Sequence, residues 1–511
     1  MTEPLPQRAE VGVVGAGAMG AGIAQIAAQA GHRVHLFDNR MGAADAAKAA
    51  LGETLAALAA KGKIARADAD AAAGRIVAVH ALGDLVSAGL VVEAIVEDID
   101  AKRKLLRELE VVVAPEAILA SNTSSLSITA LQAGMKHPGR MVGMHFFNPA
   151  PILPLVEVVS GLATERAVAD VVYATARAWG KIPVHAASTP GFIVNRCARP
   201  FYGEALRLLQ EQAADPATLD AIMREAGGFR MGPFELIDLI GADVNFAVSR
   251  SVWEAYFHDA RFTPSVLQQE MVAAGFHGRK AGRGYYAYGP DATRPAPRTE
   301  DPQPAPTHVG VAGEGPLVAG LAARMAAAGI HVAALPADPS VAPAFIAVGD
   351  ALLVPSDGRT ATERATEGEH PDLIVYDLAL DYAQCARLAI ACADTCSPAA
   401  ASAAIGALQA AGIAVSRVDD VAGLVVMRTV AMLANEAADA VTQGIASARD
   451  IDLAMRNGVN YPRGPLAWAD AVGVAHLCTV LRNLGAQYGY ERYRVAPLLA
   501  RRCATGARIA E

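Results

Sequence analysis

The sequence predicts an α/β domain with a parallel sheet, an all-helical domain after it, and then a degenerate second copy of both. Three observations support this prediction. A strand–turn–helix–strand pattern opens the chain, helical patterning runs from Thr189 to Tyr288, and segments beyond residue 307 repeat earlier ones. The length of 511 residues exceeds one ordinary domain and accommodates three or four.

The opening pattern begins with the β-branched run Val11–Val14, which leads directly into glycines. An alanine-rich helix is expected over Met19–Ala30, and a second strand over Arg33–Phe37, closed by Asp38. Such a unit implies a parallel sheet. Further strands are expected at Leu90–Ala94, Ile118–Ser121, Met141–His145 and Leu155–Val159.

The domain organisation follows from these elements and from a proline-rich stretch. We expect a Rossmann-like domain over residues 8–188, a helical domain over 189–289 and a linker over 290–306. Six prolines make that linker stiff and extended, so it should not join a packed core. A degenerate Rossmann-like domain over 307–420 and a second helical domain over 421–511 complete the chain.

The second half echoes the first. The segment Val309–Gly315 resembles Val11–Gly17, and Ala422–Arg428 resembles Pro190–Arg196. Within the helical part the matches keep one constant spacing, which indicates duplication without gaps there.

Composition excludes several classes of protein. A net charge of −8 gives no indication of a nucleic-acid surface. The six cysteines include no CxxC pair and no Cys/His cluster with zinc-ligand spacing, so we expect reduced thiols and no metal. The N-terminus has no apolar signal core, and no apolar run has transmembrane length. A soluble cytoplasmic protein is expected.

A dinucleotide site is predicted between the first strand and the first helix. The GxGxxG motif comprises Gly15, Ala16, Gly17, Ala18, Met19 and Gly20. The first glycine permits a tight turn, the second lets the backbone approach a pyrophosphate, and the third lets the helix pack on the strand. Asp38 can accept hydrogen bonds from ribose hydroxyls, which favours NAD over NADP, although Arg40 weakens that preference. The alternative is a strand–helix turn without a ligand.

The second copy of this motif is broken. Gly313 and Gly315 remain, but Val318 replaces the third glycine and Pro336 stands where the acidic residue belongs. We therefore predict that the second half binds no cofactor.

A catalytic pair is predicted on a hairpin. His145 and Glu157 are equidistant from the proline-rich loop around Pro151, so paired strands would place them opposite each other. A carboxylate beside an imidazole fixes its tautomer and makes it a general base for a hydroxyl proton. The alternative for each is a structural role, although an unpaired buried carboxylate is costly.

Serines follow the strand Ile118–Ser121 at the carboxyl end of the sheet, where open α/β folds bind ligands. One serine of the run Ser124–Ser125 could cap a helix over Leu126–Ala133 or could hydrogen-bond a substrate. Both alternatives stay open.

These motifs together resemble one family. The blocks GAGAMGAGIA, EAIVED, SNTSSL, HFFNPAPILPLVEVV, PGFIVNR and GRKAGRGYY occur in the order and spacing typical of the 3-hydroxyacyl-CoA dehydrogenases. The resemblance covers residues 8–289 and continues, degraded, through the second half. The long duplicated form is similar to the bacterial 3-hydroxyadipyl-CoA and 3-hydroxybutyryl-CoA dehydrogenases of aromatic-acid catabolism.

The resemblance implies the fold of that family's C-terminal domain for the helical part, NAD as cofactor and a (3S)-3-hydroxyacyl-CoA as substrate. It implies His145 as the base and Glu157 as its partner, with hydride passing from C3 of the substrate to the nicotinamide. The other implied site residues are Ser124 and Asn195 at the substrate oxygen, Asn148 in support, Glu97 and Lys102 near the nicotinamide and ribose, Asn122 in the cofactor site, and Lys61 and Lys63 toward coenzyme A.

Two other functions remain. One is a related dehydrogenase of a free hydroxy acid, such as a sugar acid, which would not need Lys61 and Lys63. The other is a non-catalytic scaffold, which the second half resembles, because Met427 stands where Asn195 stands in the first copy. We expect the two helical copies to pack as an internal pseudo-dimer, or the chain to form a homodimer.

Overall fold

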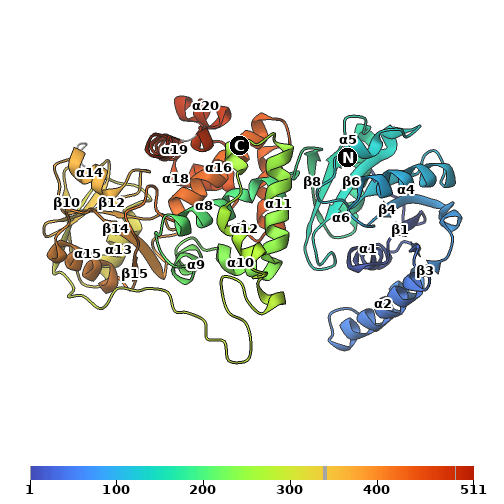
Figure 1. Ribbon diagram of the computed structural model, residues 1–511, viewed down its shortest axis with the longest axis horizontal. Helices are drawn as coiled ribbons and strands as arrows, with labels where there is room; N and C mark the ends of the chain where they lie inside the picture. Colours follow the sequence, from blue (N-terminus) through green and yellow to red (C-terminus); the bar gives the residue numbers. More distant parts are fainter. Residues whose placement is uncertain (1, 338–341, 490, 511) are drawn as a thin grey trace. The chain divides into compact units, whose positions relative to one another are not determined.

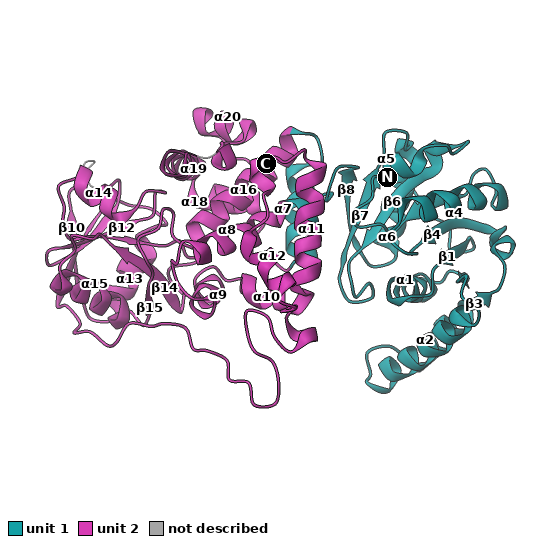
Figure 2. Cartoon of the chain, viewed as in Figure 1, with its two compact units in different colours: residues 1–196, 443–459 teal, residues 197–442, 460–511 magenta. Residues whose placement is uncertain are grey.

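The computed structural model describes residues 2–337, 342–489 and 491–510 (Figure 1). The chain forms two compact units (Figure 2): residues 1–196 with 443–459, and residues 197–442 with 460–511. The first unit therefore contains the first α/β domain together with a segment of the second helical copy. The predicted boundary between residues 188 and 189 falls inside this unit.

The first unit is built on an eight-stranded sheet with the order β3-β2-β1-β4-β5-β6-β7-β8. Neighbouring strands are parallel except β6 and β7, which pair antiparallel. The strands are β1 (Glu10–Val14), β2 (Val34–Phe37), β3 (Ile76–Val79), β4 (Ala88–Glu93), β5 (Ile118–Ser121), β6 (Met141–Phe146), β7 (Leu155–Ser160) and β8 (Ile182–Ala187).

The helices of the first unit are α1 (Ala18–Gln29), α2 (Ala43–Ala60), α3 (Arg66–Arg75), α4 (Ile99–Val112), α5 (Ile128–Gln132), α6 (Arg166–Ala178), α7 (Val194–Cys197) and α17 (Ala448–Gly458). One face of the sheet contributes Met144 and Val156 to a core shared with α1 and α6. Since side chains alternate along a strand, His145 and Glu157 point to the opposite face.

The predicted strands of this unit all form, with ends shifted by at most about two residues. The sequence did not indicate β3 or β8. Strand β8 carries Pro183, which weakens the strand signal but is tolerated because β8 is the edge of the sheet.

The second unit contains the remaining parts of both helical copies. The first helical copy supplies α8 (Arg199–Gln210), α9 (Pro216–Glu225), α10 (Pro233–Ile240), α11 (Ala242–Ala255) and α12 (Val266–Ala273). The second helical copy supplies α16 (Val426–Thr442), α18 (Pro465–Val472), α19 (Val474–Tyr488) and α20 (Pro497–Thr505). The duplication extends to backbone conformation. Gly228 and Asn460 occupy equivalent positions, and both have positive φ, 69° and 55°.

The second unit also contains a reduced α/β domain with the strand order β10-β9-β11-β12-β13-β14-β15. The strands are β9 (His308–Ala312), β10 (His331–Leu335), β11 (Phe345–Val348), β12 (Ala351–Pro355), β13 (Leu373–Tyr376), β14 (Arg387–Cys392) and β15 (Ala414–Arg417), and the helices are α13 (Ala319–Ala327), α14 (Ala361–Glu367) and α15 (Pro398–Ala410). The antiparallel hairpin β11–β12 stands where the first copy has the β4–α4–β5 crossover.

The linker differs from the prediction. Its later residues do pack on the domain that follows, because Glu300 donates its N–H to Val415 O at 2.8 Å and Gln303 donates to Gln409 Oε1 at 2.8 Å. The expectation that this stretch stays apart from a core was wrong for these residues. The residues between the prolines keep N–H groups that can pair with a strand edge.

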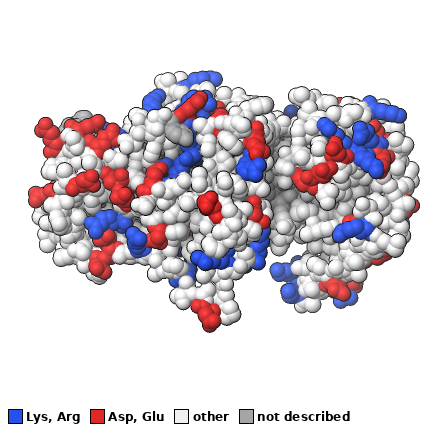
Figure 3. Space-filling model, in the orientation of Figure 1, with Lys and Arg blue, Asp and Glu red and all other residues white. Residues whose placement is uncertain are grey.

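Acidic and basic side chains are interspersed over both units on the face that Figure 3 shows. In the part of the chain that the structure describes, no helix has the length and apolar character needed to cross a membrane. The same residues include no group of three or more His, Cys, Asp or Glu arranged to hold a metal ion.

Candidate active site

The glycine-rich turn between β1 and α1 has the geometry that a dinucleotide needs. Gly15 has φ 101°, and a Cβ there would lie 2.6 Å from Ala94 O. A Cβ at Gly20 would collide with Gly15 O, so this glycine lets α1 pack on the turn. At Gly17 nothing lies within 4 Å of such a Cβ, and α1 starts at the next residue. The backbone at the helix N-terminus is thus open to a pyrophosphate, which its partial positive charge favours.

Asp38 lies beside this turn. Its Oδ2 accepts the N–H of Ala16 at 2.8 Å, and both of its oxygens accept hydrogen bonds from the Arg40 guanidinium at 3.0 and 3.1 Å. The hydrogen bond from Arg40 is the main reason why the pKa of Asp38 is lowered to about 2. Asp38 is therefore a carboxylate at neutral pH. It can accept from ribose hydroxyls, while Arg40, with 70% of its side chain exposed, lies next to it.

The geometry joins His145 and Glu157 as the hairpin symmetry predicts. They are register partners on β6 and β7, and His145 Nδ1 lies 2.7 Å from Glu157 Oε2. Glu157 is fully buried and His145 is 5% exposed. The other carboxylate oxygen, Oε1, accepts the N–H groups of Ile193 at 3.1 Å and Val194 at 2.9 Å.

These contacts determine what the imidazole can do. A carboxylate at Nδ1 holds a proton there, so Nε2 remains as the nitrogen that can take a proton from a hydroxyl. The two backbone donors at the start of α7 hold the carboxylate in place. The sequence did not reveal them, because they come from a turn far along the chain.

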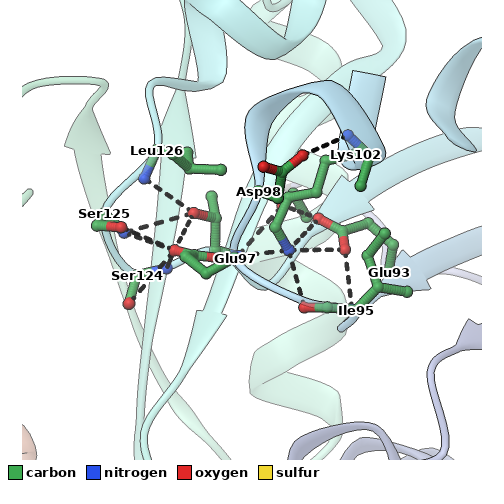
Figure 4. Close-up of polar contacts among 11 residues, drawn as sticks. Glu93, Ile95, Glu97, Asp98, Lys102, Ser124, Ser125 and Leu126 are labelled. Atoms are coloured by element: carbon green, nitrogen blue, oxygen red, sulfur yellow. Dashed lines mark hydrogen bonds and ion pairs between the residues drawn. The ribbon is translucent and has the colours of Figure 1, made fainter. Parts of the chain in front are cut away.

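Ser124 and Ser125 form a turn around Glu97 (Figure 4). Glu97 Oε1 accepts the N–H of Ser124 at 2.9 Å and the hydroxyl of Ser125 at 2.9 Å. It also accepts the hydroxyl of Thr123 at 2.6 Å. Burial alone would raise the pKa of Glu97, but the hydrogen bond from Thr123 and the charge of Lys102 outweigh burial and lower it. Ser124 is exposed at the carboxyl edge of the sheet, where a substrate oxygen could reach it.

The helix that follows this turn is α5, and its N-cap is Ser127, whose hydroxyl accepts the N–H of Ala130 at 3.1 Å. The capping role considered for Ser124 or Ser125 was therefore wrong. The helix begins later than the predicted Leu126, so the serine nearest its true start caps it.

Lys102 is buried rather than open to a ligand. Its Nζ lies 3.0 and 2.9 Å from the two oxygens of Glu93, 3.3 Å from Ile95 O and 3.4 Å from Glu97 Oε2. Both Lys102 and Glu93 are at most 1% exposed. The pair thus fixes the end of β4, from which Glu97 projects. Glu93 was not predicted, although a glutamate at the end of an apolar strand is a signal that could have identified it.

Three asparagines lie at this edge. Asn122 directly follows β5, and its Oδ1 accepts the N–H of Phe146 at 2.8 Å. Asn195 in α7 places its Nδ2 3.4 Å from Ser124 O, so these two predicted substrate contacts are adjacent. Asn148 is exposed just after β6, and its bond to Pro149 is cis.

Lys61 and Lys63 lie apart from this cluster. They are exposed in the turn after α2, before α3 begins at Arg66. They contact neither the His145–Glu157 pair nor the glycine turn. They belong to the helical arm of α2 and α3 beside the sheet.

In its described residues, the second copy keeps neither the open helix N-terminus at the glycine turn nor the imidazole–carboxylate pair. Helix α13 begins at Ala319, four residues after Gly315, whereas α1 begins directly after Gly17. Val318 is 1% exposed and occupies the start of that helix. The helix N-terminus is therefore displaced from the glycine turn, and the β11–β12 hairpin leaves no counterpart of Glu97.

An open glycine turn on a parallel sheet, a carboxylate beside it and a buried imidazole–carboxylate pair are together the features of a nicotinamide-dependent oxidoreductase. Comparison with known proteins gives the particular family. The model of the 3-hydroxyacyl-CoA dehydrogenase NAD-binding domain matches residues 10–189, that of its C-terminal domain matches 191–288 and 423–508, and that of the 3-hydroxybutyryl-CoA dehydrogenase reduced Rossmann-fold domain matches 353–421.

Similar proteins agree with this result. A 3-hydroxyadipyl-CoA dehydrogenase of Escherichia coli K12 is 41% identical over 96% of this chain and 97% of its own length. A probable 3-hydroxybutyryl-CoA dehydrogenase of Deinococcus radiodurans is 42% identical over 54% of this chain and 99% of its own. A crystal structure described as 3-hydroxybutyryl-CoA dehydrogenase from Escherichia coli K12 has a TM-score of 0.88 and 40% identity, covering 98% of this chain and 99% of that one.

The chain belongs to the 3-hydroxyacyl-CoA dehydrogenase family. It is an NAD-dependent oxidoreductase that acts on 3-hydroxyacyl-CoA thioesters. The predicted fold class and cofactor are thereby confirmed, including the reduced second Rossmann-fold region.

Proposed function

We propose that the chain oxidises a short (3S)-3-hydroxyacyl-CoA to the 3-ketoacyl-CoA, with 3-hydroxyadipyl-CoA as the first candidate substrate. The contact of 2.7 Å between His145 Nδ1 and Glu157 carries the proposed chemistry. The choice of acyl group rests on the relative that shares the full two-copy length and is named a 3-hydroxyadipyl-CoA dehydrogenase. The half-length relatives are named for 3-hydroxybutyryl-CoA, which is the second candidate.

In the proposed mechanism His145 accepts the 3-hydroxyl proton at Nε2, and Glu157 stabilises the resulting imidazolium. NAD, when bound, takes up the hydride from C3 of the substrate. Asn195 and Ser124 hydrogen-bond the substrate oxygen as its charge changes, with Asn148 supporting the site. Because the imidazolium can return the proton, the same groups serve the reverse reduction.

The remaining residues position the cofactor and the substrate. Glu97 holds the Ser124–Ser125 turn through five hydrogen bonds. Lys102 acts on the cofactor side through Glu97 rather than by direct contact, and Asn122 lines the same side. Lys61 and Lys63 provide cations for the phosphates of coenzyme A.

A substrate panel tests this proposal. Coenzyme A thioesters of 3-hydroxy acids of graded length, with and without a terminal carboxylate, are oxidised with NAD while NADH absorbance is followed. The proposal expects the short thioesters to react and the matching free acids to fail. Turnover of a free sugar acid at a comparable rate would favour the alternative dehydrogenase. Under the proposed function, Lys61→Ala and Lys63→Ala should raise KM for thioesters only.

We further propose that the second half is a non-catalytic partner that packs on the first helical copy as an internal pseudo-dimer. Glu204 in α8 and Glu436 in α16 are equivalent positions, and each binds an arginine of the other copy. Arg492 Nη2 lies 2.6 Å from Glu204, and Arg261 Nη1 lies 3.4 Å from Glu436. Reciprocal pairs of this kind are the mark of a two-fold interface.

A chain shortened to end at Gly289 tests the pseudo-dimer. It should expose the apolar surface that α16 covers on α8, and should dimerise or aggregate in sedimentation experiments. A soluble and fully active monomer would show that the second half serves some other purpose.

Location of the protein in the cytoplasm stays a prediction.

A further inference from the structure

A segment of the second, non-catalytic copy lies against the catalytic sheet of the first. Residues 443–459 belong to the same compact unit as β1–β8 (Figure 2). Within that unit α17 packs on β7 and β8. Strand β7 carries Glu157. The second half therefore contributes an element to the unit that holds the catalytic pair.

The two copies exchange this element reciprocally. Ala187 donates its N–H to Ile445 O at 2.8 Å, and the equivalent residues in exchanged roles, Asp419 and Ala213, make the same bond at 2.9 Å. Helix α9, the counterpart of α17, packs on β14, the counterpart of β7. Each helical copy thus lends the same helix to the sheet of the other copy.

The exchanged segment touches the residues that hold the catalytic carboxylate. Gly458 ends α17, and a Cβ there would lie 2.6 Å from Leu155 Cδ2 and 3.1 Å from Val194 Cγ2. Leu155 is two residues before Glu157 on the same face of β7, and Val194 donates its N–H to Glu157 Oε1 at 2.9 Å.

A second contact between the same two segments lies further along α7. Arg196, which is 1% exposed, donates from Nη1 to Gln443 Oε1 at 2.8 Å. Asn195, the candidate substrate contact, stands between Val194 and Arg196. Residues 443 and 458 of the second half therefore hold the short α7 segment on both sides of this asparagine.

The glycine is specific to the catalytic side. The residue equivalent to Gly458 in the first copy is Ala226, whose carbonyl accepts the N–H of Leu380, in the loop between β13 and β14, at 2.8 Å. The first copy thus accommodates an alanine at this position, whereas on the catalytic side a Cβ would require the side chains of Leu155 and Val194 to shift. Both neighbours are at most 2% exposed, so neither has open space to move into.

We infer that one segment of the second half, residues 443–459, acts as a positioning element for the catalytic pair, although the second half has no catalytic group of its own. Through Gly458 and Gln443, the segment 443–459 sets the position of α7, and through α7 it sets Glu157 and Asn195. The inference rests on the roles proposed above for these two residues.

The test uses the full-length chain and five variants of it. Gly458→Ala should lower kcat on the order of 10- to 100-fold, because misplacement of a catalytic group by a fraction of an ångström is costly. KM for NAD should not change, since β1, which leads into the glycine turn at Gly15, is separated from β7 by three strands. Gly485→Ala is the matched control. It also sits in a helix of the second copy, where a Cβ would have its nearest neighbour at 3.9 Å.

A compensating change separates positioning from general damage. Leu155→Val in the Gly458→Ala background removes Cδ2 of residue 155, the atom that would lie nearest to the new Cβ, and should restore most of the lost kcat. Gln443→Ala is an independent variant at an exposed position that should fold, and it should lower kcat several-fold with an unchanged melting temperature.

The outcomes are distinguishable. If the wild type oxidises the thioester and His145→Gln does not, the proposed function stands. If Gly458→Ala and Gln443→Ala then both keep wild-type kcat, the positioning role is refuted. Loss of kcat in Gly485→Ala equal to that in Gly458→Ala would refute it as well. A selective loss at Gly458 with rescue by Leu155→Val supports it.

Discussion

The hairpin β6–β7 and its counterpart β13–β14 each hold a buried carboxylate that accepts backbone N–H groups at the start of a helix. The two carboxylates serve different purposes. In the first copy the carboxylate is Glu157 on the second strand, and it accepts the N–H groups of Ile193 and Val194. In the second copy Asp377 stands at the position of His145. It accepts the N–H groups of the equivalent residues, Val425 at 3.1 Å and Val426 at 2.7 Å.

This difference separates two functions of the buried carboxylate. A carboxylate at a helix N-terminus satisfies backbone donors and fixes the helix, whichever strand supplies it. The proposed catalysis additionally needs an imidazole across the hairpin. The second copy has Ala389 where Glu157 stands and Asp377 where His145 stands. The second copy thus kept the structural part of the site and lost the chemical part.

The largest effect should come from His145. Replacing it by Gln removes the base while leaving the glycine turn intact, so kcat should fall on the order of 10²–10⁴-fold with little change in NAD affinity. Stopped-flow NADH absorbance and NAD titration measure the two quantities. His137→Gln, at an exposed position, is the control. Near-normal turnover of His145→Gln would contradict the assignment of the base.

The next effect concerns stability where the two copies meet. Burial alone would raise the pKa of Glu204, but the charges of Arg492 and Arg428 outweigh it and lower the pKa to about 2, below the ordinary 4.5. A lowered pKa means that Glu204 stabilises the fold above about pH 4.5 and that this contribution disappears as the pH falls toward 2. Glu204→Gln should therefore reduce the free energy of unfolding by roughly 3 kcal/mol at neutral pH.

Urea unfolding of Glu204→Gln at several pH values measures this loss. The difference from the wild type should shrink as the solution is acidified below pH 4.5. Glu53→Gln, an exposed residue of α2, should change stability little. A difference that stays constant on acidification would show that the charge of Glu204 does not hold the copies together.

A smaller effect is expected at the ribose site. Asp38→Ala should weaken NAD binding about tenfold and narrow the gap to NADP, because the charged acceptor for the ribose hydroxyls is lost. Fluorescence titration with both cofactors measures the gap. The counterpart change, Arg40→Ala, leaves the carboxylate in place and should preserve the NAD preference. Equal use of both cofactors by the wild type would overturn this reading of Asp38.

The smallest expected effect is the absence of a second NAD-binding signal. Calorimetric titration should give one NAD site per chain, because Val318 and the late start of α13 remove the second pyrophosphate site. Two NAD sites per chain would refute the prediction that only the first copy binds the cofactor. A single site lost on Gly15→Ala would assign it to the first copy.

The sequence alone determined the parts of this protein that depend on local pattern. The glycine motif with Asp38 predicted the NAD domain, and the alternation around Pro151 predicted that His145 faces Glu157. The constant spacing between the helical copies predicted the duplication. Periodicity, turn chemistry and strand pairing act over short stretches of chain, so the residues themselves carry this information.

Tertiary structure decided what depends on distant segments meeting. The donors that hold Glu157 come from the start of α7, and Lys102 is buried beside Glu93. Glu300 and Gln303 pack on the following domain despite the neighbouring prolines. The placement of α17 on the catalytic sheet has no local signal, because a helix of the second copy looks the same whichever sheet it covers. Only the packing shows that Gly458 approaches Leu155, since the space available to a side chain is a property of both partners and not of either sequence segment.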